Sequence, residues 1–203
     1  MEYYVYEKDT NSITLKREQE DHAKFYAFVI DDALAYMHGE NVIFRDLEPE
    51  NILIDRARYP VIVDFGCAKF SSVDETFTVD GAPTYLAPEM IKRLGHGVRV
   101  DHWVLGIVIY EMIAGKHPFH HDGLLQCFLY EAICNEDFDP VPSNISMEAF
   151  HLIDQLLGKD PMQRIGMLTG KENDIISHDW FGSLDIAKLR CKEIEAPWIP
   201  IIQ

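Results

Sequence analysis

Two carboxylates and an amide stand close together in the first third of the chain, in an order that could serve phosphoryl transfer. Asp46 and Asn51 belong to the polar string FRDLEPEN at 44–51, and Asp64 begins the string DFG. Phosphoryl transfer needs a carboxylate that orients the attacking hydroxyl group, and Asp46 is the candidate. It also needs oxygen ligands that hold Mg²⁺ against the phosphates, and Asn51 and Asp64 are the candidates.

Short strands are expected to position these side chains. Residues 51–54 and 61–63 are apolar runs of strand length, and Tyr59-Pro60 between them indicates a turn. Both polar strings therefore lie at strand edges, where loops present side chains.

Helical patterns dominate the rest of the chain. Apolar residues between Ala23 and Met37 recur at helical spacing, and Gly39 is a stop signal. The segment 101–114 is apolar on nearly every side, which predicts a buried helix. Further helices are expected at about 123–134, 146–157 and 172–178, and an extended tail around Pro197 and Pro200. The predicted fold class is mainly α with a few short β-strands.

The composition is that of one ordinary globular domain. The chain has 203 residues, 47% of them hydrophobic, and no apolar stretch approaches the roughly 20 residues of a membrane helix. Without a secretory signal at Met1, we expect a cytoplasmic location, with a nuclear one also open. The formal charge of −16 suits basic peptide partners and argues against nucleic acid and membrane partners. The four cysteines lack the paired spacing of a zinc site or disulfide framework.

Three further features accompany the two polar strings: Ala87-Pro88-Glu89, the string DHWVLG at 101–106, and Arg164. The whole set resembles the eukaryotic protein kinases, specifically their large C-terminal lobe. The stretches 100–115, 173–181 and 194–200 are similar to the AGC group, above all to its cyclic-AMP- and cyclic-GMP-dependent kinases. The resemblance covers roughly residues 17–200. It implies transfer of the ATP γ-phosphate, with Mg²⁺, to Ser or Thr of basic peptides, and a regulatory subunit or domain as a partner.

The resemblance also implies individual roles. Glu50, Asn51 and Asp64 are expected at the ATP site. Glu89 is expected to pair with Arg164 and anchor the end of the activation segment, and Asp101 to cap the backbone of the catalytic loop. Glu50 and Glu111 would receive an arginine two residues before the phosphorylated residue; the plain alternative for these two is a solvated surface charge.

The activation segment carries an expected modification site. Thr78 aligns with the activation-loop phosphosite of the family, and Thr76 is the competing acceptor. Arg45 and Lys69 are expected to form a phosphate clamp, by which we mean two cations that hold a phosphate through charge-assisted hydrogen bonds. A solvated loop threonine is the alternative for Thr78.

Two departures from the family pattern fall inside the site. Glu48 stands where the family has a lysine that touches the transferred phosphate, and a glutamate there would repel it at a cost of several kcal/mol. Ala82 stands where the family has a threonine that hydrogen-bonds the catalytic aspartate and that lysine. The two changes remove both partners of one interaction, the hydrogen bond between that threonine and that lysine, and are therefore interpreted as coupled. Phe44, where the AGC group has tyrosine, is a milder change.

The predicted organisation is a single protein kinase domain without its N-terminal lobe. Residues 1–16 form a hinge-like, irregular start, 17–182 a helical C-terminal lobe, and 183–203 the start of an AGC tail. We find no glycine-rich loop and no strand lysine, and we expect no measurable Mg-ATP binding. Two readings stay open: an incomplete or impaired kinase, and an inactive pseudokinase lobe that serves as an interaction module. A small-molecule phosphotransferase is disfavoured because Ala87-Pro88-Glu89 and the long activation segment serve peptide substrates.

Overall fold

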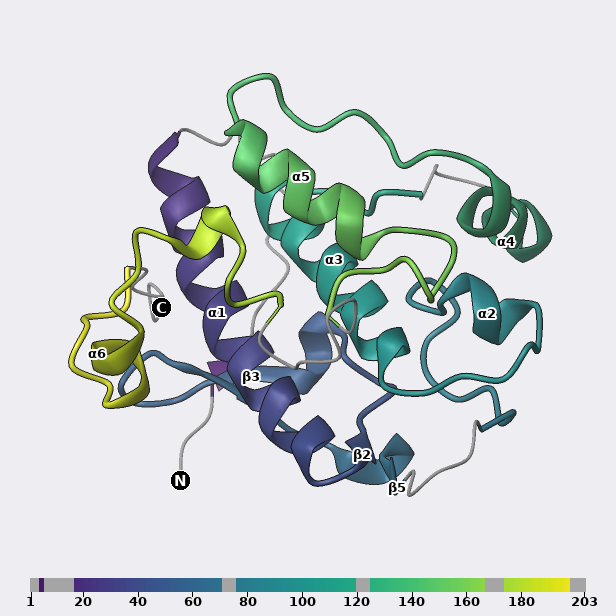
Figure 1. Cartoon of the computed structure of the whole chain (residues 1–203), viewed down its shortest axis with the longest axis horizontal. Coiled ribbons are helices and arrows are strands. Elements are labelled where there is room, and N and C mark those ends of the chain that lie inside the picture. The colour runs from purple at the N-terminus through teal and green to yellow at the C-terminus, as the bar shows by residue number, and fades with distance from the viewer. Residues whose placement is uncertain (1–3, 6–16, 71–75, 120–124, 167–173, 198–203) are drawn as a thin grey trace.

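Helices make up most of the molecule (Figure 1), as the sequence predicts. The computed structural model describes residues 4–5, 17–70, 76–119, 125–166 and 174–197. The α-helices are α1 (Arg17–Gly39), α2 (Pro88–Ile91), α3 (Arg99–Ala114), α4 (Gln126–Asn135), α5 (Met147–Leu156) and α6 (Ile186–Arg190). The strands are β1 (Tyr4–Val5), β2 (Val42–Ile43), β3 (Ile52–Ile54), β4 (Pro60–Ile62) and β5 (Lys69–Phe70). Most of the hinge-like start and the end of the tail lie outside the described residues.

The core is built around α3, the helix that the sequence predicts to be buried. Its residues from Val100 to Tyr110 are all buried, and it packs against α1 on one side and α5 on the other (Figure 1). Gly106 permits the close approach to α5, because a Cβ at that position would lie 2.8 Å from Leu156 Cβ. Gly115 ends α3 in the left-handed conformation at φ 69°.

A buried carboxylate ties the start of α5 to α1. Ser146 caps α5 by accepting a hydrogen bond from the Ala149 backbone N–H at 3.1 Å. Glu20 of α1 in turn accepts from the Ser146 backbone N–H and from Trp180 Nε1, each at 2.9 Å. Burial alone would raise the pKa of Glu20, but these hydrogen bonds outweigh it and the pKa is lowered.

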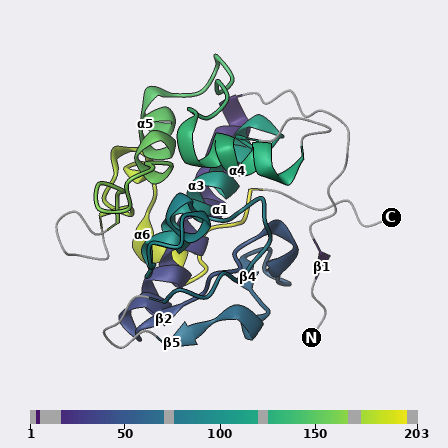
Figure 2. The same cartoon turned by 90° about the vertical axis from the view of Figure 1, so that its right-hand side faces the viewer.

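The strands form two small antiparallel sheets that lie beside the polar strings. One sheet has the order β1-β3-β4, with Ile52 opposite Ile62 and Ile54 opposite Pro60. The other pairs β2 with β5 and lies at the bottom of the molecule in Figure 2. Because β3 follows Asn51 and β4 ends just before Asp64, the sheet fixes the spacing between these two polar residues.

The helix expected at 172–178 is wrong where it can be tested. Residues 174–177 form turns, and 172–173 lie outside the described residues. A short 3-10 helix follows at Asp179–Phe181, where Trp180 and Phe181 are buried in the core. His178 caps it by accepting from the Trp180 N–H at 3.2 Å. Insertion of the two aromatic rings into the core therefore decides the local backbone. In the described part of the chain, no helix is both long enough and apolar enough to cross a membrane.

Candidate active site

The amide of Asn51 holds the carboxylate of Asp46. Asn51 Nδ2 donates to the Asp46 backbone oxygen at 2.9 Å and to Asp46 Oδ2 at 3.1 Å. Both hydrogen bonds use the amide nitrogen, so the oxygen Oδ1 of Asn51 faces the opposite side. The structure thus brings together the two residues that the sequence names as catalytic, with the Asp46 side chain fixed and the Asn51 oxygen directed away from it.

Asp101 supports this loop from inside the core. Its Oδ2 accepts from the Phe44 N–H at 2.9 Å and its Oδ1 from the Arg45 N–H at 2.7 Å. His38 Nε2 lies 2.7 Å from Asp101 Oδ2, and this histidine is a partner that sequence reasoning missed. Arg45 has φ 69°, a strained value for a residue with a side chain. The fully buried carboxylate of Asp101 therefore holds the loop in a conformation that it would not adopt freely.

Asp64 begins the DFG string in a left-handed turn. Its φ is 61°, and its Oδ1 accepts from the Gly66 N–H at 3.0 Å. The Asp64 side chain is exposed at the end of β4. Asn51 and Asp64 fit Mg²⁺, which takes oxygen ligands, needs only one or two from the protein, and takes the rest from phosphates and water. Within the described residues, no group of three or more His, Cys, Asp or Glu side chains could hold a metal by itself.

The residues of the expected phosphate clamp also lie together. Arg45 Nη1 donates to Thr78 Oγ1 at 2.6 Å, and Lys69 Nζ donates to Thr76 Oγ1 at 2.7 Å. The two hydroxyl oxygens are 3.1 Å apart. Thr76 is only 3% exposed, whereas Thr78 is exposed, so Thr78 is the more accessible acceptor of the two. Sequence reasoning missed Asp80, whose Oδ2 lies 2.8 Å from Arg45 Nη1.

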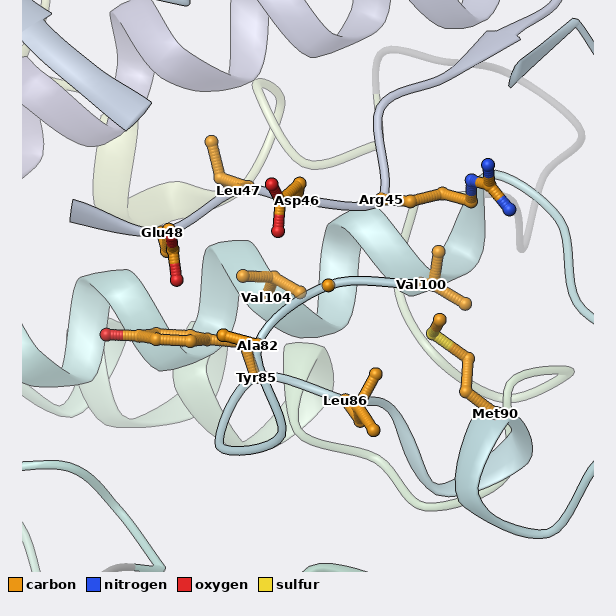
Figure 3. A pocket seen from close by; sticks show the side chains of 11 residues that line it. Arg45, Asp46, Leu47, Glu48, Ala82, Tyr85, Leu86, Met90, Val100 and Val104 are labelled. Carbon is orange, nitrogen blue, oxygen red and sulfur yellow. The ribbon is translucent and has the colours of Figure 1, made fainter. Parts of the chain in front are cut away.

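The two unusual residues face one small pocket beside Asp46. Glu48 and Ala82 line it together with Asp46 (Figure 3), and its volume is only about 10 Å³, room for about one water molecule. Burial, and then the negative charges of Asp46 and Glu50, raise the pKa of Glu48. Gly81 brings the Ala82 segment close at φ 103°, since a Cβ there would lie 2.7 Å from the Arg45 backbone oxygen. The departures at positions 48 and 82 therefore share one site.

An acidic wall lies next to this pocket. We use that name for Glu48, Glu50 and Glu111, whose charges all act on Tyr85. The Tyr85 hydroxyl donates to Glu111 Oε2 at 3.0 Å. Burial, then Glu111, and then the other two carboxylates raise the pKa of Tyr85 strongly. Tyr85 is a third residue that the sequence analysis missed, after His38 and Asp80.

The anchor pair of Glu89 and Arg164 lies at the end of the activation segment. Arg164 Nη1 and Nη2 donate to Glu89 Oε1 and Oε2 at 2.7 and 2.9 Å. Arg164 also donates to the backbone oxygens of Arg99 and Gly158 at 2.7 and 3.1 Å. Arg164 is fully buried and Glu89 is 2% exposed. This arrangement joins α2 to the start of α3.

Comparison with known proteins agrees with this geometry. The model of the protein kinase domain matches residues 1–181. A cAMP-dependent protein kinase catalytic subunit of Dictyostelium discoideum is 42% identical over 181 residues, which are 89% of this chain and 27% of that protein. The catalytic subunit PRKX of Homo sapiens is 39% identical over 178 residues, 88% of this chain and 49% of that protein. The chain thus spans about half or less of these relatives. With the protein kinase model matching most of its length, the chain belongs to the protein kinase family, and it is similar to the cAMP-dependent kinases.

Proposed function

We propose that this chain carries the catalytic loop of a serine/threonine protein kinase, which transfers the γ-phosphate of ATP to peptide hydroxyl groups. The observation that carries the proposal is the double hydrogen bond by which Asn51 fixes Asp46. A fixed carboxylate is what positioning of a hydroxyl nucleophile requires, since the protein's part in phosphoryl transfer is mainly orientation and charge neutralisation.

Each polar residue then has one task. Asp46 orients the substrate hydroxyl group and accepts its proton. The oxygen of Asn51 and the carboxylate of Asp64 would hold Mg²⁺, with Glu50 at the edge of the nucleotide site. When bound, the metal neutralises charge on the phosphates. Asp101 keeps the backbone of the loop in place through the hydrogen bonds to Phe44 and Arg45.

The acidic wall supports a basic peptide as the substrate. Glu50 is exposed, and Glu111 keeps one carboxylate oxygen hydrogen-bonded to Tyr85. An arginine side chain entering here would meet three carboxylates, and charge-assisted hydrogen bonds of this kind are about twice as strong as neutral ones. The relatives are named as cAMP-dependent protein kinases, which supports a cyclic-nucleotide-binding regulatory protein as a further partner.

Glu48 and Ala82 impair this machinery. A carboxylate in the pocket next to Asp46 adds negative charge where the transferred phosphate must pass. At 4 Å, one such repulsion costs on the order of 4 kcal/mol at an effective dielectric constant of 20. We therefore expect no measurable Mg-ATP binding by calorimetry for the chain as it stands. Micromolar binding that Asp64→Ala abolishes would overturn that expectation.

A peptide phosphorylation assay tests the proposal. The substrate is a peptide with one serine and an arginine two residues before it. Combining Glu48→Lys with Ala82→Thr should raise the rate at least tenfold. Relief of only part of the repulsion at Glu48 is enough, because about 1.4 kcal/mol off the barrier changes a rate tenfold. Adding Asp46→Asn should remove the gain, whereas Asp154→Asn on the exposed side of α5 should not. A double variant that neither binds Mg-ATP nor phosphorylates the peptide would reject the kinase proposal.

The acidic wall favours one second candidate, a lobe that binds basic peptides without transferring phosphate. Binding of the same peptide to the unmodified chain, weakened by Glu111→Gln and unaffected by Asp46→Asn, would support it if no variant phosphorylates the peptide. Since Glu111 accepts the Tyr85 hydroxyl, Tyr85→Phe serves as a control that removes this hydrogen bond and keeps the charge of the wall.

A further inference from the structure

An aspartate outside the family motifs occupies the phosphate clamp. Asp80 Oδ2 lies 2.8 Å from Arg45 Nη1, and the same nitrogen donates to Thr78 Oγ1 at 2.6 Å. A phosphate attached to the Thr78 hydroxyl would approach this guanidinium from the side on which the Asp80 carboxylate already lies. One anion is therefore in contact with the clamp before any modification.

Arg45 is a fixed cation and not a mobile surface side chain. Its side chain is 7% exposed, and its Nε donates to the Cys67 backbone oxygen at 2.7 Å. Its backbone N–H donates to the buried Asp101 carboxylate. A guanidinium that is fixed and mostly buried needs a carboxylate partner, because an unpaired buried charge is costly. Asp80 meets that need while remaining 42% exposed itself.

The contact lies one residue before the segment that covers the catalytic loop. Gly81 follows Asp80 directly and lies so close to the loop that a Cβ would be 2.7 Å from the Arg45 oxygen and 3.4 Å from Asp46 Oδ1. Ala82 then lines the pocket beside Asp46. The ion pair thus fixes the chain where it passes over Asp46.

Cys67, whose backbone oxygen binds Arg45, also responds to the charge of Asp80. Burial, followed by the charges of Asp46 and Asp80, raises the pKa of the Cys67 thiol, while Arg45 acts in the opposite direction. Cys67 therefore lies within the field of both carboxylates and of the clamp arginine.

We propose that Asp80 is a positioning residue that takes the place of an activation-loop phosphate, so that the segment 78–82 is held on the catalytic loop without phosphorylation of Thr78. Phosphorylation of Thr78 would then add little, because the Asp80 carboxylate already binds the guanidinium. The carboxylate would also repel the added phosphate, which carries about −1.5 to −2 charges. The link to catalysis rests on the proposed kinase function, whereas the occupied clamp does not.

Hydrogen exchange of the whole chain, measured by mass spectrometry, tests the proposal directly. Four forms are compared: the unmodified chain, Asp80→Asn, the conservative variant Asp80→Glu, and the surface control Asp154→Asn. Each of the first two is also prepared with phosphothreonine incorporated at position 78. The readout is the exchange rate of the backbone amides at 78–82.

In Asp80→Asn these amides should exchange about five to ten times faster, the change expected for loss of one ordinary intramolecular hydrogen bond. Asp80→Glu should keep most of the protection, and Asp154→Asn all of it. Phosphothreonine at position 78 should restore protection in Asp80→Asn and change the unmodified chain by less than about twofold, within the range of a surface ion pair. Such a rescue would show that Asp80 acts as the anion bound by Arg45, since a phosphate could not replace an aspartate that serves only the local fold.

Unchanged exchange in Asp80→Asn would overturn the proposal, and so would equal protection by phosphothreonine in both backgrounds. The peptide phosphorylation assay separates this proposal from the kinase function. It is run on the same set of variants, each rebuilt in the Glu48→Lys/Ala82→Thr background. Loss of protection in Asp80→Asn with no phosphorylation in any sample would reject the kinase function and keep the occupied clamp.

Discussion

Arg164 meets Glu89 through two parallel hydrogen bonds, with both partners buried. The contacts are 2.7 and 2.9 Å long and join α2, at the end of the activation segment, to a loop far along the chain. The guanidinium also reaches backbone oxygens on both sides. The pair therefore connects the segment that follows the pocket to the core, and its loss should be felt in the stability of the whole domain.

Replacing Glu89 by glutamine should destabilise the fold by about 3–5 kcal/mol, because it leaves the buried Arg164 charge without its counter-charge. Urea unfolding followed by circular dichroism measures this. The matched control is Asp32→Asn, which breaks the partly exposed Arg190–Asp32 pair at 2.6 Å. That change should cost no more than about 1 kcal/mol, and similar losses for both variants would contradict the anchoring role of Glu89.

Asp101→Asn should weaken the support of the catalytic loop. The new amide keeps one acceptor oxygen but presents N–H groups where Phe44 N–H or Arg45 N–H now donates. An unmade hydrogen bond of a buried group costs about 1–3 kcal/mol. We expect a matching loss of unfolding free energy, with faster hydrogen exchange at 44–46. If those amides stay protected, Asp101 does not hold the loop.

Acid should relieve the repulsion at Glu48. Burial and the neighbouring carboxylates raise its pKa, so Glu48 becomes neutral at a pH above the ordinary carboxyl value of about 4.3. Mg-ATP binding to the chain, which we expect to be unmeasurable at pH 7.5, should become measurable as the pH is lowered toward the pKa of Glu48, in a fluorescence titration with an ATP analogue. Glu48→Gln should bind more tightly at pH 7.5 and lose this pH dependence. Parallel pH curves for the two proteins would show that Glu48 is not the group responsible.

Asp31 should destabilise the fold at neutral pH. It is 2% exposed on α1, and no partner for its Oδ2 is found among the described residues. Burial, and then Asp32, raise the pKa of Asp31 to about 8. A raised folded-state pKa favours folding below the unfolded value near 3.8, and this contribution is lost as the pH rises toward 8.

Asp31→Asn should accordingly raise the unfolding free energy at pH 7.5, by an amount on the order of a few kcal/mol. Its effect near pH 4 should be small. Thermal unfolding at both pH values measures the difference. The neighbouring variant Asp32→Asn, which loses the ion pair with Arg190, should not stabilise the protein. A destabilised Asp31→Asn protein at pH 7.5 would show that the carboxylate has a partner that asparagine cannot serve.

Local patterns predicted the main elements well. The apolar run at 101–114 indicates a buried helix, and α3 is buried from Val100 to Tyr110. The short runs around the Tyr59-Pro60 turn became β3 and β4. The helix expected at 172–178 is wrong because Trp180 and Phe181 enter the core there, and a three-dimensional packing demand outweighs a weak helical pattern.

The catalytic set was recognisable from the sequence because its parts are close in the chain. Asp46 and Asn51 lie in one turn, and their hydrogen bond spans only five positions. The roles that the sequence proposes for Asp64, Thr78 and Glu111 stay predictions, although the structure places each of them in a consistent setting.

The sequence by itself determined the family, the buried central helix and the residues that could orient a hydroxyl group and hold Mg²⁺, because each of these is written in residue types at short spacing. Only the tertiary structure decided the partners. Glu20 meets Ser146 across 126 positions, and Asp80 reaches Arg45 only because Gly81 lets the activation segment lie on the catalytic loop. Such contacts depend on the packing of whole elements, since no local rule links residues that the fold alone brings within hydrogen-bonding distance.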